Sequence, residues 1–594
     1  MSTVTLARND GDSAPTIADP RRRRLVLITV CAALVAVVAG VSGLNVAQQA
    51  IALDLGASQS QILWAINGYT VALAALLMPV GAIGDRWGRK PVLLTGLAVF
   101  ALGNLAAAMA ASPALLIGGR VVAGAGAAMV MPVTLSVITS SFPEEARGNA
   151  VGVWAGFAGA GGVMGLLASA VIIDDLTWPW LFAIPVTLAV VAGLLTAAVV
   201  PNSHERGEGR FDTLGSLLSV LAVGGIVLGI HEGPERGWTD PLTLVGVAIG
   251  VASLVGFVAR ELRTAHPLLD VRVFANRALS SGILALTVVF GIMFGIFLTL
   301  MQFMQAVLGY SAIRGAVGLL PMALVMIGLS PFAPRVSQRL GLRTMLVAGA
   351  LLVGGGLVLM AQMVDTSSYW SIVPGLMLTA LGLAATMTPA TTAITGSLSR
   401  AHQGVASALN DTSREIGGAL GVALMGSIFN AQYRAEVSDM AARLDPAQGK
   451  MVKDGIAGAV EVAQGMGRDG APVLAAARQA LVDAWAGSMW IGAGIAVVAA
   501  GLVIALSLGR RGREDMTADG LLTGAADDDA NDADALAAEL AGAPAGNGSR
   551  PVPRPLPHPE PVLVTVGAGS GDDSSSGSGS GDSTSIGARR LGSS

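Results

Sequence analysis

Charged residues are scarce in this sequence. Asp, Glu, Lys and Arg make up 13% of the 594 residues, whereas hydrophobic residues make up 53% and glycine occupies 78 positions. A water-soluble protein of this length does not have so apolar a composition. The composition therefore excludes a soluble globular protein and indicates one that lies in a membrane.

Cysteine is nearly absent as well. The single cysteine, Cys31, lies in an apolar run, so one chain can build neither a disulfide framework nor a thiolate metal cluster. We also find no Ser/His/Asp set, no metal-ligand cluster and no Walker-type nucleotide loop in the sequence. We therefore expect no enzymatic activity, no cofactor or metal, and no direct use of ATP.

Apolar runs of about 20 residues recur along the chain, and each is long enough to cross about 30 Å of hydrocarbon as a helix. They predict fourteen spans, an even number that places both termini on one side of the membrane. The predicted spans are 25–47, 62–83, 91–111, 114–138, 149–173, 178–200, 212–231, 239–259, 278–307, 312–334, 344–364, 370–396, 404–429 and 485–508.

The distribution of Lys and Arg predicts the orientation, because cytoplasmic loops carry most of these residues. Four arginines, Arg21 to Arg24, precede the first span, and alternate loops hold most of the others. Short loops on the opposite face carry only Arg236 and Arg314. We therefore expect a multi-pass protein of a bacterial cytoplasmic membrane with both termini in the cytoplasm.

Two long polar segments lie outside the predicted spans. Segment 430–484 precedes the last span, and we expect a partly helical external hairpin there, with a substrate-capturing domain as the alternative. Segment 509–594 contains an acidic patch, a Pro-rich piece and a Gly/Ser repeat, which predict a disordered cytoplasmic tail.

The loop between the second and third spans has an ordered pattern of glycine and charge. Glycine lets helices approach closely and turn tightly, while Asp85 can accept hydrogen bonds from a helix end or pair with an arginine. This loop resembles the signature loop of the major facilitator superfamily. The resemblance implies a conformational latch, and a basic loop that only sets topology is the alternative. The residues are Gly81, Asp85, Arg86, Gly88, Arg89 and Lys90.

The resemblance also implies a fold. Segment 335–343 is similar to a second copy of the latch loop, as expected of two six-helix halves, and the fourteen-span drug:proton antiporter branch carries two additional central helices. We thus expect an all-α integral membrane protein with the major facilitator fold. Its parts are an N-terminal segment 1–24, a half 25–200, two added helices 201–260, a half 261–508 and the tail 509–594.

Charged residues lie away from the ends of two of the predicted spans, where they are costly and therefore functional by default. Arg120 lies in the motif Arg120-x-x-x-Gly124-x-Gly126, which resembles the superfamily's motif in span four. The resemblance implies a role for Arg120 in proton transfer, and a structural clamp on a neighbouring carbonyl group is the alternative. At about 100° per residue, Asp411 lies about 60° from Arg414 and about 40° from Glu415, so all three share one helix face.

Arg414 can neutralise Asp411 and leave Glu415 partly unpaired. A carboxyl group in a poorly hydrated cavity is suited to take up and release a proton, and the drug:proton antiporters have a similar acidic segment here. We therefore predict proton coupling at Asp411, Arg414, Glu415 and Arg120. The alternative is a closed structural network in which none of these groups titrates.

Side chains of several predicted spans are candidates for the wall of a substrate cavity. They combine polar groups with flexible or aromatic side chains that suit promiscuous apolar binding, although such residues also pack helices or face lipid. The predicted cavity residues are Asn45, Gln49, Trp64, Tyr69, Phe294, Phe297, Met301 and Asn410.

Two positions depart from the family pattern. Gly40 stands where the first span of this branch carries an acid, and Gly165-Leu166 with Ser169-Ala170 replaces a Gly-Pro pair and a double glycine in span five. The fold is compatible with both changes. The first change favours neutral, zwitterionic or anionic substrates over cations.

The resemblance implies a proton-coupled efflux transporter that exports lipophilic drugs by alternating access, powered by the proton gradient. We expect its partners to be the small-molecule substrate, protons and membrane lipid, with no nucleic acid and a monomeric chain. One alternative is export of an endogenous lipid or secondary metabolite. Another is a non-transporting membrane scaffold or regulator that acts through its outer segment or its tail.

Overall fold

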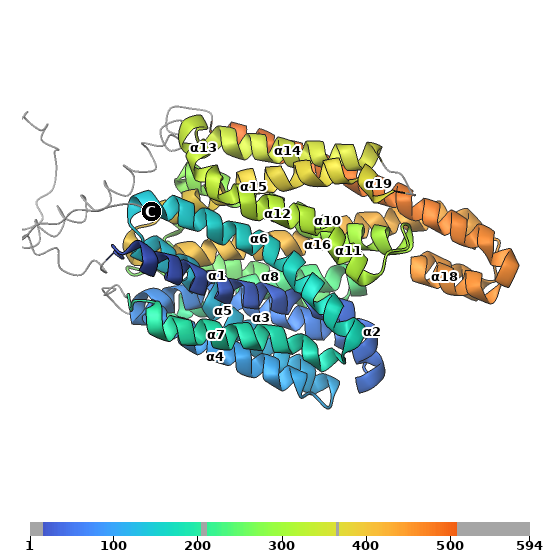
Figure 1. The fold of residues 1–594 in the computed structure, drawn as a ribbon, viewed down its shortest axis with the longest axis horizontal. Helices are drawn as coiled ribbons and strands as arrows, with labels where there is room; N and C mark the ends of the chain where they lie inside the picture. The colour runs from blue at the N-terminus through green and yellow to red at the C-terminus, as the bar shows by residue number, and fades with distance from the viewer. Residues whose placement is uncertain (1–15, 204–210, 364–367, 508–594) are drawn as a thin grey trace, which may run out of the picture. The chain divides into compact units, whose positions relative to one another are not determined.

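Long helices lying side by side make up the part of the chain that the structure, a computed structural model, describes: residues 16–203, 211–363 and 368–507 (Figure 1). No strand occurs among these residues. Residues 1–15 of the predicted N-terminal segment and residues 509–594 of the predicted tail lie outside them. The all-α fold class that the apolar runs predict is confirmed.

The first group of helices corresponds to the N-terminal half. Side-chain caps begin several of them: Asp19 accepts from the backbone of Arg21, and Ser58 forms a capping box with Gln61. Its elements are α1 (Pro20–Ser42), α2 (Leu44–Leu55), α3 (Gln59–Trp87), α4 (Arg89–Ala108), α5 (Pro113–Ser141), α6 (Glu144–Asp175), the short 3₁₀ helix η1 (Trp178–Phe182) and α7 (Ala183–Val199).

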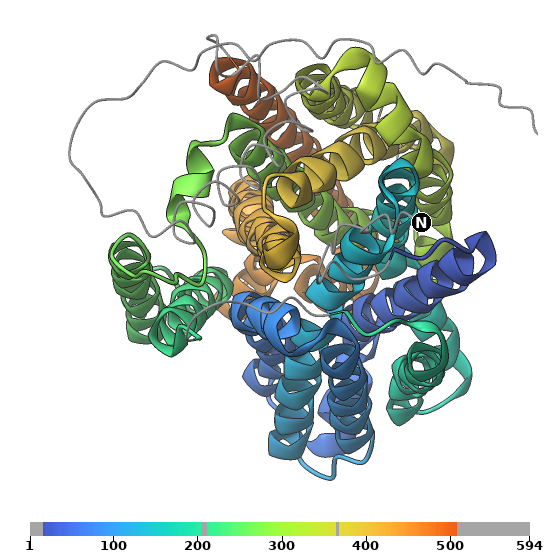
Figure 2. The same cartoon turned by 90° about the vertical axis from the view of Figure 1, so that its left-hand side faces the viewer.

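The two added helices are α8 (Thr213–Arg236) and α9 (Pro241–Glu261). Glycines hold them close together, because a Cβ on Gly225 would collide with the backbone of Gly250. These helices are central in the sequence but lie at the edge of the bundle (Figure 2). There α8 packs against α3 and also against α16 (Gln403–Ala441), so it covers a seam between the two halves.

The second group of helices corresponds to the C-terminal half. Prolines 321, 331 and 334 divide the predicted span 312–334 into short pieces, since proline lacks the backbone N–H that a helix interior needs. Besides α16, the elements are η2 (Val271–Ala275), α10 (Arg277–Ala306), α11 (Ala312–Gly318), α12 (Leu320–Leu329), η3 (Ser330–Phe332), α13 (Ala333–Leu340), α14 (Leu342–Gln362), η4 (Tyr369–Ser371), α15 (Val373–Gly396), η5 (Arg400–His402) and α19 (Ala471–Leu506).

Segment 430–484 is helical. Helices α16 and α19 both extend through it, and α17 (Pro446–Asp454), α18 (Ile456–Gly465) and η6 (Gly467–Gly470) connect them. Figure 1 shows this hairpin at the end of the molecule opposite the start of α1. Tyr433, Val437 and Val462 are buried within it and continue the hydrophobic core of the helix bundle.

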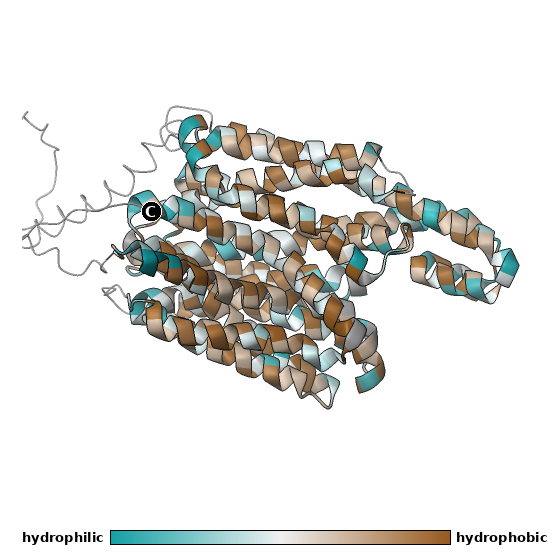
Figure 3. Cartoon of the chain, in the orientation of Figure 1, coloured by the Kyte–Doolittle hydropathy of each residue, from teal (hydrophilic) through white to brown (hydrophobic). Residues whose placement is uncertain are grey.

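Thirteen helices in the described part are long and apolar enough to cross a membrane. The fourteenth predicted span corresponds to α16, which carries Asp411, Arg414 and Glu415 in its first half and is not among these thirteen. The hydropathy colouring places hydrophilic residues mainly at the helix ends (Figure 3). We call the end with Arg86, Arg89 and Arg339, where α1 starts, the basic end.

The two halves meet along α3 with α16 and along α6 with α12. Glycine permits both contacts: a Cβ on Gly152 of α6 would lie 2.6 Å from the carbonyl oxygen of Ser330, and a Cβ on Gly81 of α3 would lie 2.8 Å from the Cβ of Ala408. These small residues bring ionisable side chains of both halves close together.

Candidate functional site

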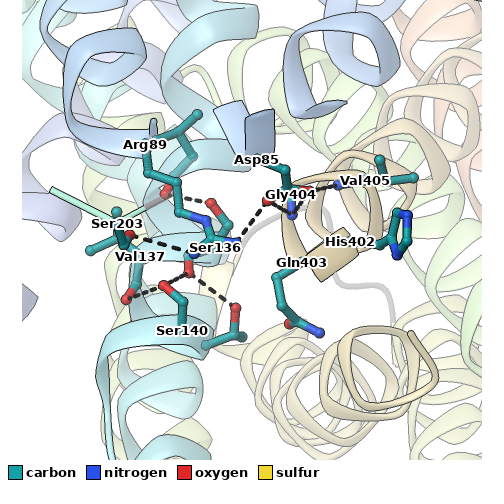
Figure 4. A network of polar contacts seen from close by, with 12 residues as sticks. Asp85, Arg89, Ser136, Val137, Ser140, Ser203, His402, Gln403, Gly404 and Val405 are labelled. Atoms are coloured by element: carbon teal, nitrogen blue, oxygen red, sulfur yellow. Dashed lines mark hydrogen bonds and ion pairs between the residues drawn. The ribbon is translucent and has the colours of Figure 1, made fainter. Parts of the chain in front are cut away.

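Asp85, near the end of α3, caps the first turn of α16 at the basic end (Figure 4). The backbone N–H of Gly404 donates to both carboxylate oxygens, at 2.8 Å and 2.7 Å, and the N–H of Val405 donates to one of them at 3.2 Å. These N–H groups have no partner within their own helix, and a helix N-terminus favours a negative charge. Asp85 therefore joins one half to the other.

Two glycines allow that contact. A Cβ added to Gly81 or to Gly404 would collide with the carbonyl oxygen of the other residue. Gly88 ends α3 with a φ of 108°, a backbone conformation that favours glycine, and a Cβ there would lie 2.9 Å from the side-chain oxygen of Asn202. The glycine pattern of the loop thus sets the helix spacing and the turn.

Arg89 is fully buried and anchors Asp85 from the same side of the seam. Its Nη2 lies 2.8 Å from Asp85 Oδ1, and its backbone N–H donates to the Ser203 carbonyl at 3.0 Å. Lys90 donates to the Ala197 carbonyl at 2.8 Å, which ties α4 to the end of α7. Arg86 is half-buried at the end of α3. The six predicted latch residues therefore lie together.

A second polar cluster lies in the first half of α16, beyond the turn that Asp85 caps. Arg414 Nη1 donates to Asp411 Oδ1 at 3.1 Å, and Asn410 donates to the same oxygen at 3.2 Å while accepting from Thr391 of α15 at 2.9 Å. Asp411 is fully buried, and its Oδ2 has no hydrogen-bond partner in the described part of the chain. One carboxylate oxygen of Asp411 therefore accepts both hydrogen bonds, from Arg414 and from Asn410.

Aromatic rings from two helices enclose the guanidinium of Arg414. Its central carbon lies 4.6 Å from the ring centre of Phe290 on α10 and 5.5 Å from that of Trp154 on α6. Both distances are within the range of cation–π attraction. Trp154 is itself held in place, since its Nε1 donates to Thr134 at 3.1 Å. We call Trp154 and Phe290 the aromatic clamp.

Glu415 follows Arg414 but differs from Asp411 in its surroundings. It is only partly buried and makes no hydrogen bond to any described residue. The charges that act on it are those of Arg414 and Asp411. The next residue, Ile416, packs with Val227 and Ile230 of α8. Glu415 thus lies near the seam that α8 covers, with a carboxylate that no partner holds.

Arg120 of α5 is fully buried beside Tyr69 of α3. Its Nε donates to the Ala65 carbonyl at 3.2 Å, and its central carbon lies 4.2 Å from the Tyr69 ring centre. Among the described residues, nothing bonds to its Nη1 and Nη2. Both Arg120 and Glu415 of α16 are close enough to act electrostatically on Tyr69.

Gly40, which stands where the family pattern has an acidic residue, lies close to Tyr69, the neighbour of Arg120. A Cβ there would lie 3.3 Å from the Phe100 ring and 3.9 Å from the hydroxyl oxygen of Tyr69. That hydroxyl group donates to the Val37 carbonyl at 3.0 Å. The first helix therefore places no carboxylate at Gly40, although Tyr69 and Arg120 lie nearby.

The predicted cavity residues do not share one environment. Trp64, Phe294, Phe297 and Met301 are half-buried, whereas Tyr69 and Asn410 are fully buried and use their polar atoms within the protein. Phe294 stacks near Phe290 with ring centres 6.3 Å apart and thus adjoins the clamp. Asn45 and Gln49 lie in α2, beyond the break at Gly43, and their side chains lie outside the described part.

Sequence reasoning missed three participants. Gly404 binds Asp85 through its backbone, which leaves no side-chain signal. Thr391 and Trp154 reach the α16 cluster only through tertiary packing. A lone tryptophan within a glycine-rich span was the one available signal for Trp154.

Comparisons with known proteins agree with this architecture. Residues 28–422 match the Major Facilitator Superfamily. The chain is 32% identical to the puromycin resistance protein pur8 of Streptomyces alboniger, with 71% of this chain and 84% of the relative covered. It is 31% identical to the multidrug efflux pump LfrA of Mycolicibacterium smegmatis, with 77% and 91% covered. Among solved structures, human MFSD10, an organic anion transporter, aligns with a TM-score of 0.51 at 14% identity, over 80% of this chain and 100% of that one.

Proposed function

Because the chain belongs to the Major Facilitator Superfamily, we propose that it is a proton-coupled antiporter that exports lipophilic small molecules across the bacterial cytoplasmic membrane. The two halves rock about a central site so that it opens to one side of the membrane at a time. The proton gradient supplies the energy, with no cofactor, and the chain acts as a monomer without enzymatic activity and without binding nucleic acid.

The relatives support the substrate class. One is named for resistance to puromycin and the other as a multidrug efflux pump, and each is matched over more than four fifths of its own length, 84% and 91%. A drug-sized lipophilic molecule suits the half-buried Phe294, Phe297 and Met301, of which Phe294 adjoins the clamp.

The basic end faces the cytoplasm in this proposal, since cytoplasmic loops collect Lys and Arg. The contact of Asp85 with Gly404 then closes the cytoplasmic side in the conformation described above. Opening toward the cytoplasm requires this contact to break. The N–H groups in the first turn of α16 then lose their hydrogen-bond acceptor, and the Asp85–Arg89 pair becomes exposed. The latch therefore opposes inward opening until substrate binding compensates for its loss.

The observation that carries the proposal is the unequal environment of the two carboxyl groups in α16. Asp411 is neutralised by Arg414, whereas Glu415 makes no hydrogen bond or ion pair within the described part of the chain and retains accessible surface. A carboxylate next to a pair that is already neutral can gain or lose a proton without breaking an ion pair. We assign the exchanged proton to Glu415 and the orientation of the cluster to Asp411 and Arg414.

Efflux of a fluorescent lipophilic dye from energised cells tests the proposal. The wild type should export the dye only while the proton gradient persists, and Glu415→Gln should abolish gradient-dependent export. Glu436→Gln is the matched control, because Glu436 is exposed on the same helix beyond the central cluster. Unchanged export by Glu415→Gln would exclude Glu415 as the coupling residue, and no export of any lipophilic dye by the wild type would exclude drug efflux.

A second candidate within transport is export of a metabolite or lipid that the same cell makes. Gly40 favours it, because no carboxylate at that position is available to select a cation near Arg120. Export of an anionic or neutral metabolite, with lipophilic cations neither exported nor bound, is the result that would favour this candidate.

A further inference from the structure

The guanidinium of Arg414 lies in a setting built for a cation. Two aromatic faces, from Trp154 and Phe290, and one carboxylate, from Asp411, surround it, and all four side chains are buried. Aromatic faces with an adjacent carboxylate are the groups that recognise organic cations. The chain's own arginine occupies this site in the conformation described above.

The arginine is only loosely bonded there. A guanidinium carries five N–H groups, yet Arg414 makes one hydrogen bond within the described part of the chain, to Asp411, and its buried Nε has no partner. A well-satisfied structural arginine would use more of its donors. The cost of removing this guanidinium from the clamp is therefore lower than that for a fully bonded one.

We propose that Trp154, Phe290 and Asp411 form a binding site for the cationic group of a lipophilic substrate, and that Arg414 occupies this site as an internal competitor. The inference rests on the proposed export function and names the charge of one substrate class. A cation can take the place of Arg414 without leaving the Asp411 carboxylate buried and unpaired, which is strongly unfavourable.

Glu415 is the group that can attract the guanidinium of Arg414 when it leaves the clamp. The charged or titratable groups that act electrostatically with Glu415 are Arg414 and Asp411 on its own helix and Tyr69 on α3. An ionised Glu415 attracts Arg414 away from the clamp and so admits the substrate cation. A protonated Glu415 does not, so Arg414 returns to the rings and expels the cation. The exchange of one cation for one proton follows from this competition.

The clamp also bridges the halves. Trp154 belongs to α6 of the N-terminal half, whereas Phe290 and Arg414 belong to α10 and α16 of the C-terminal half. Movement of the halves during alternating access separates the two rings. The site can therefore bind a cation tightly in one conformation and release it in the other.

Direct binding to the purified full-length protein tests the proposal, with radiolabelled tetraphenylphosphonium as the cation and triphenylphosphine oxide as an uncharged comparison. Arg414→Met should bind the cation about tenfold more tightly, whereas Arg414→Lys should stay near the wild type. Phe290→Leu and Trp154→Leu should each bind it about tenfold more weakly, as expected for loss of one aromatic face. Trp154→Phe and the exposed-site control Trp490→Leu should change little.

The uncharged ligand distinguishes charge recognition from a larger cavity. Its affinity should change less than twofold in every variant, and an equal gain for both ligands in Arg414→Met would overturn the proposal. A double variant gives an independent check: Glu415→Gln should weaken cation binding, and adding Arg414→Met should restore it. If the double variant binds as weakly as Glu415→Gln, Arg414 is no competitor.

Dye export separates this inference from the proposed function. Gradient-dependent export by the wild type together with unchanged cation affinity in the Arg414, Phe290 and Trp154 variants leaves the exporter intact and overturns the clamp site. The predicted affinity changes without any gradient-dependent export establish the cation site and overturn the antiporter.

Discussion

The carboxylate of Asp85 and the backbone N–H of Gly404, 319 residues apart in the chain, form hydrogen bonds of 2.8 Å and 2.7 Å that join the two halves of the protein at its basic end. Loss of the negative charge should weaken this contact. A charge-assisted hydrogen bond is about twice as strong as a neutral one.

Asp85→Asn should therefore populate the conformation that is open at the basic end. We expect about tenfold faster maleimide labelling of a cysteine placed at Ser140, which is buried near the latch. Cys31→Ser provides a cysteine-free background. Lys90→Gln is the control, because Lys90 bonds to Ala197 within the same half and leaves the Asp85–Gly404 contact intact. Equal labelling in Asp85→Asn and the control would contradict the latch.

Closure of the latch also needs a glycine at position 81. A methyl group there would meet the carbonyl oxygen and carbon of Gly404 at 2.5 Å and 2.9 Å, so Gly81→Ala should cost about 1–3 kcal/mol in the closed conformation. We expect a lower Tm and slower export. Gly118→Ala is the matched control, since a Cβ at Gly118 would meet nothing within 4 Å. A normal Tm and normal export in Gly81→Ala would show that the helices do not need this close approach.

The Asp411–Arg414 ion pair should contribute measurably to the Tm of the protein. Removal of one partner of a buried ion pair typically costs about 3–5 kcal/mol, because the other charge stays buried without a counter-charge. Asp411→Asn should therefore lower Tm more than Asp439→Asn, an exposed position on the same helix. The double variant Asp411→Asn with Arg414→Gln should recover part of the loss. Simple addition of the two single effects would mean that the residues are not coupled.

The Tyr69 ring should matter more than its hydroxyl group. Tyr69→Phe removes one hydrogen bond to Val37, worth about 1 kcal/mol, and keeps the ring 4.2 Å from the central carbon of Arg120. Tyr69→Leu also removes that ring from a guanidinium whose Nη1 and Nη2 have no hydrogen-bond partner among the described residues. We expect Tyr69→Phe to keep most export and Tyr69→Leu to lose it. Indistinguishable variants in an export assay would exclude the ring as the partner that Arg120 needs.

Local pattern was enough to predict much of this protein. Apolar runs long enough to cross a bilayer predicted the helices, and the helical period placed Asp411, Arg414 and Glu415 on one face. The family resemblance of the loop implied a latch in which Asp85 bonds to a helix end or pairs with an arginine, although the sequence could not identify α16 as that helix. Any residue can donate its backbone N–H, so Gly404 left no signal of its own.

The remaining features depend on tertiary packing. Nothing near Trp154 in the sequence indicates that its ring meets Arg414, because the contact arises only when α6 packs against the other half. Fourteen spans were predicted, and thirteen helices of the described part are long and apolar enough to cross a membrane. The break at Gly43 and the division of span 312–334 at its prolines were not predicted. The length of an apolar run indicates where a chain can cross a membrane, but it does not indicate whether the helix is continuous there.

Proton movement driven by substrate is the decisive measurement for the proposed coupling. Purified protein in liposomes that enclose a pH-sensitive dye should move protons when a lipophilic substrate is added to one side, and Glu436→Gln should behave in the same way. Glu415→Gln should move no protons even at substrate concentrations high enough to saturate it, because its side chain cannot take up or release a proton. Substrate-driven proton movement that persists in Glu415→Gln would contradict the assignment of coupling to α16.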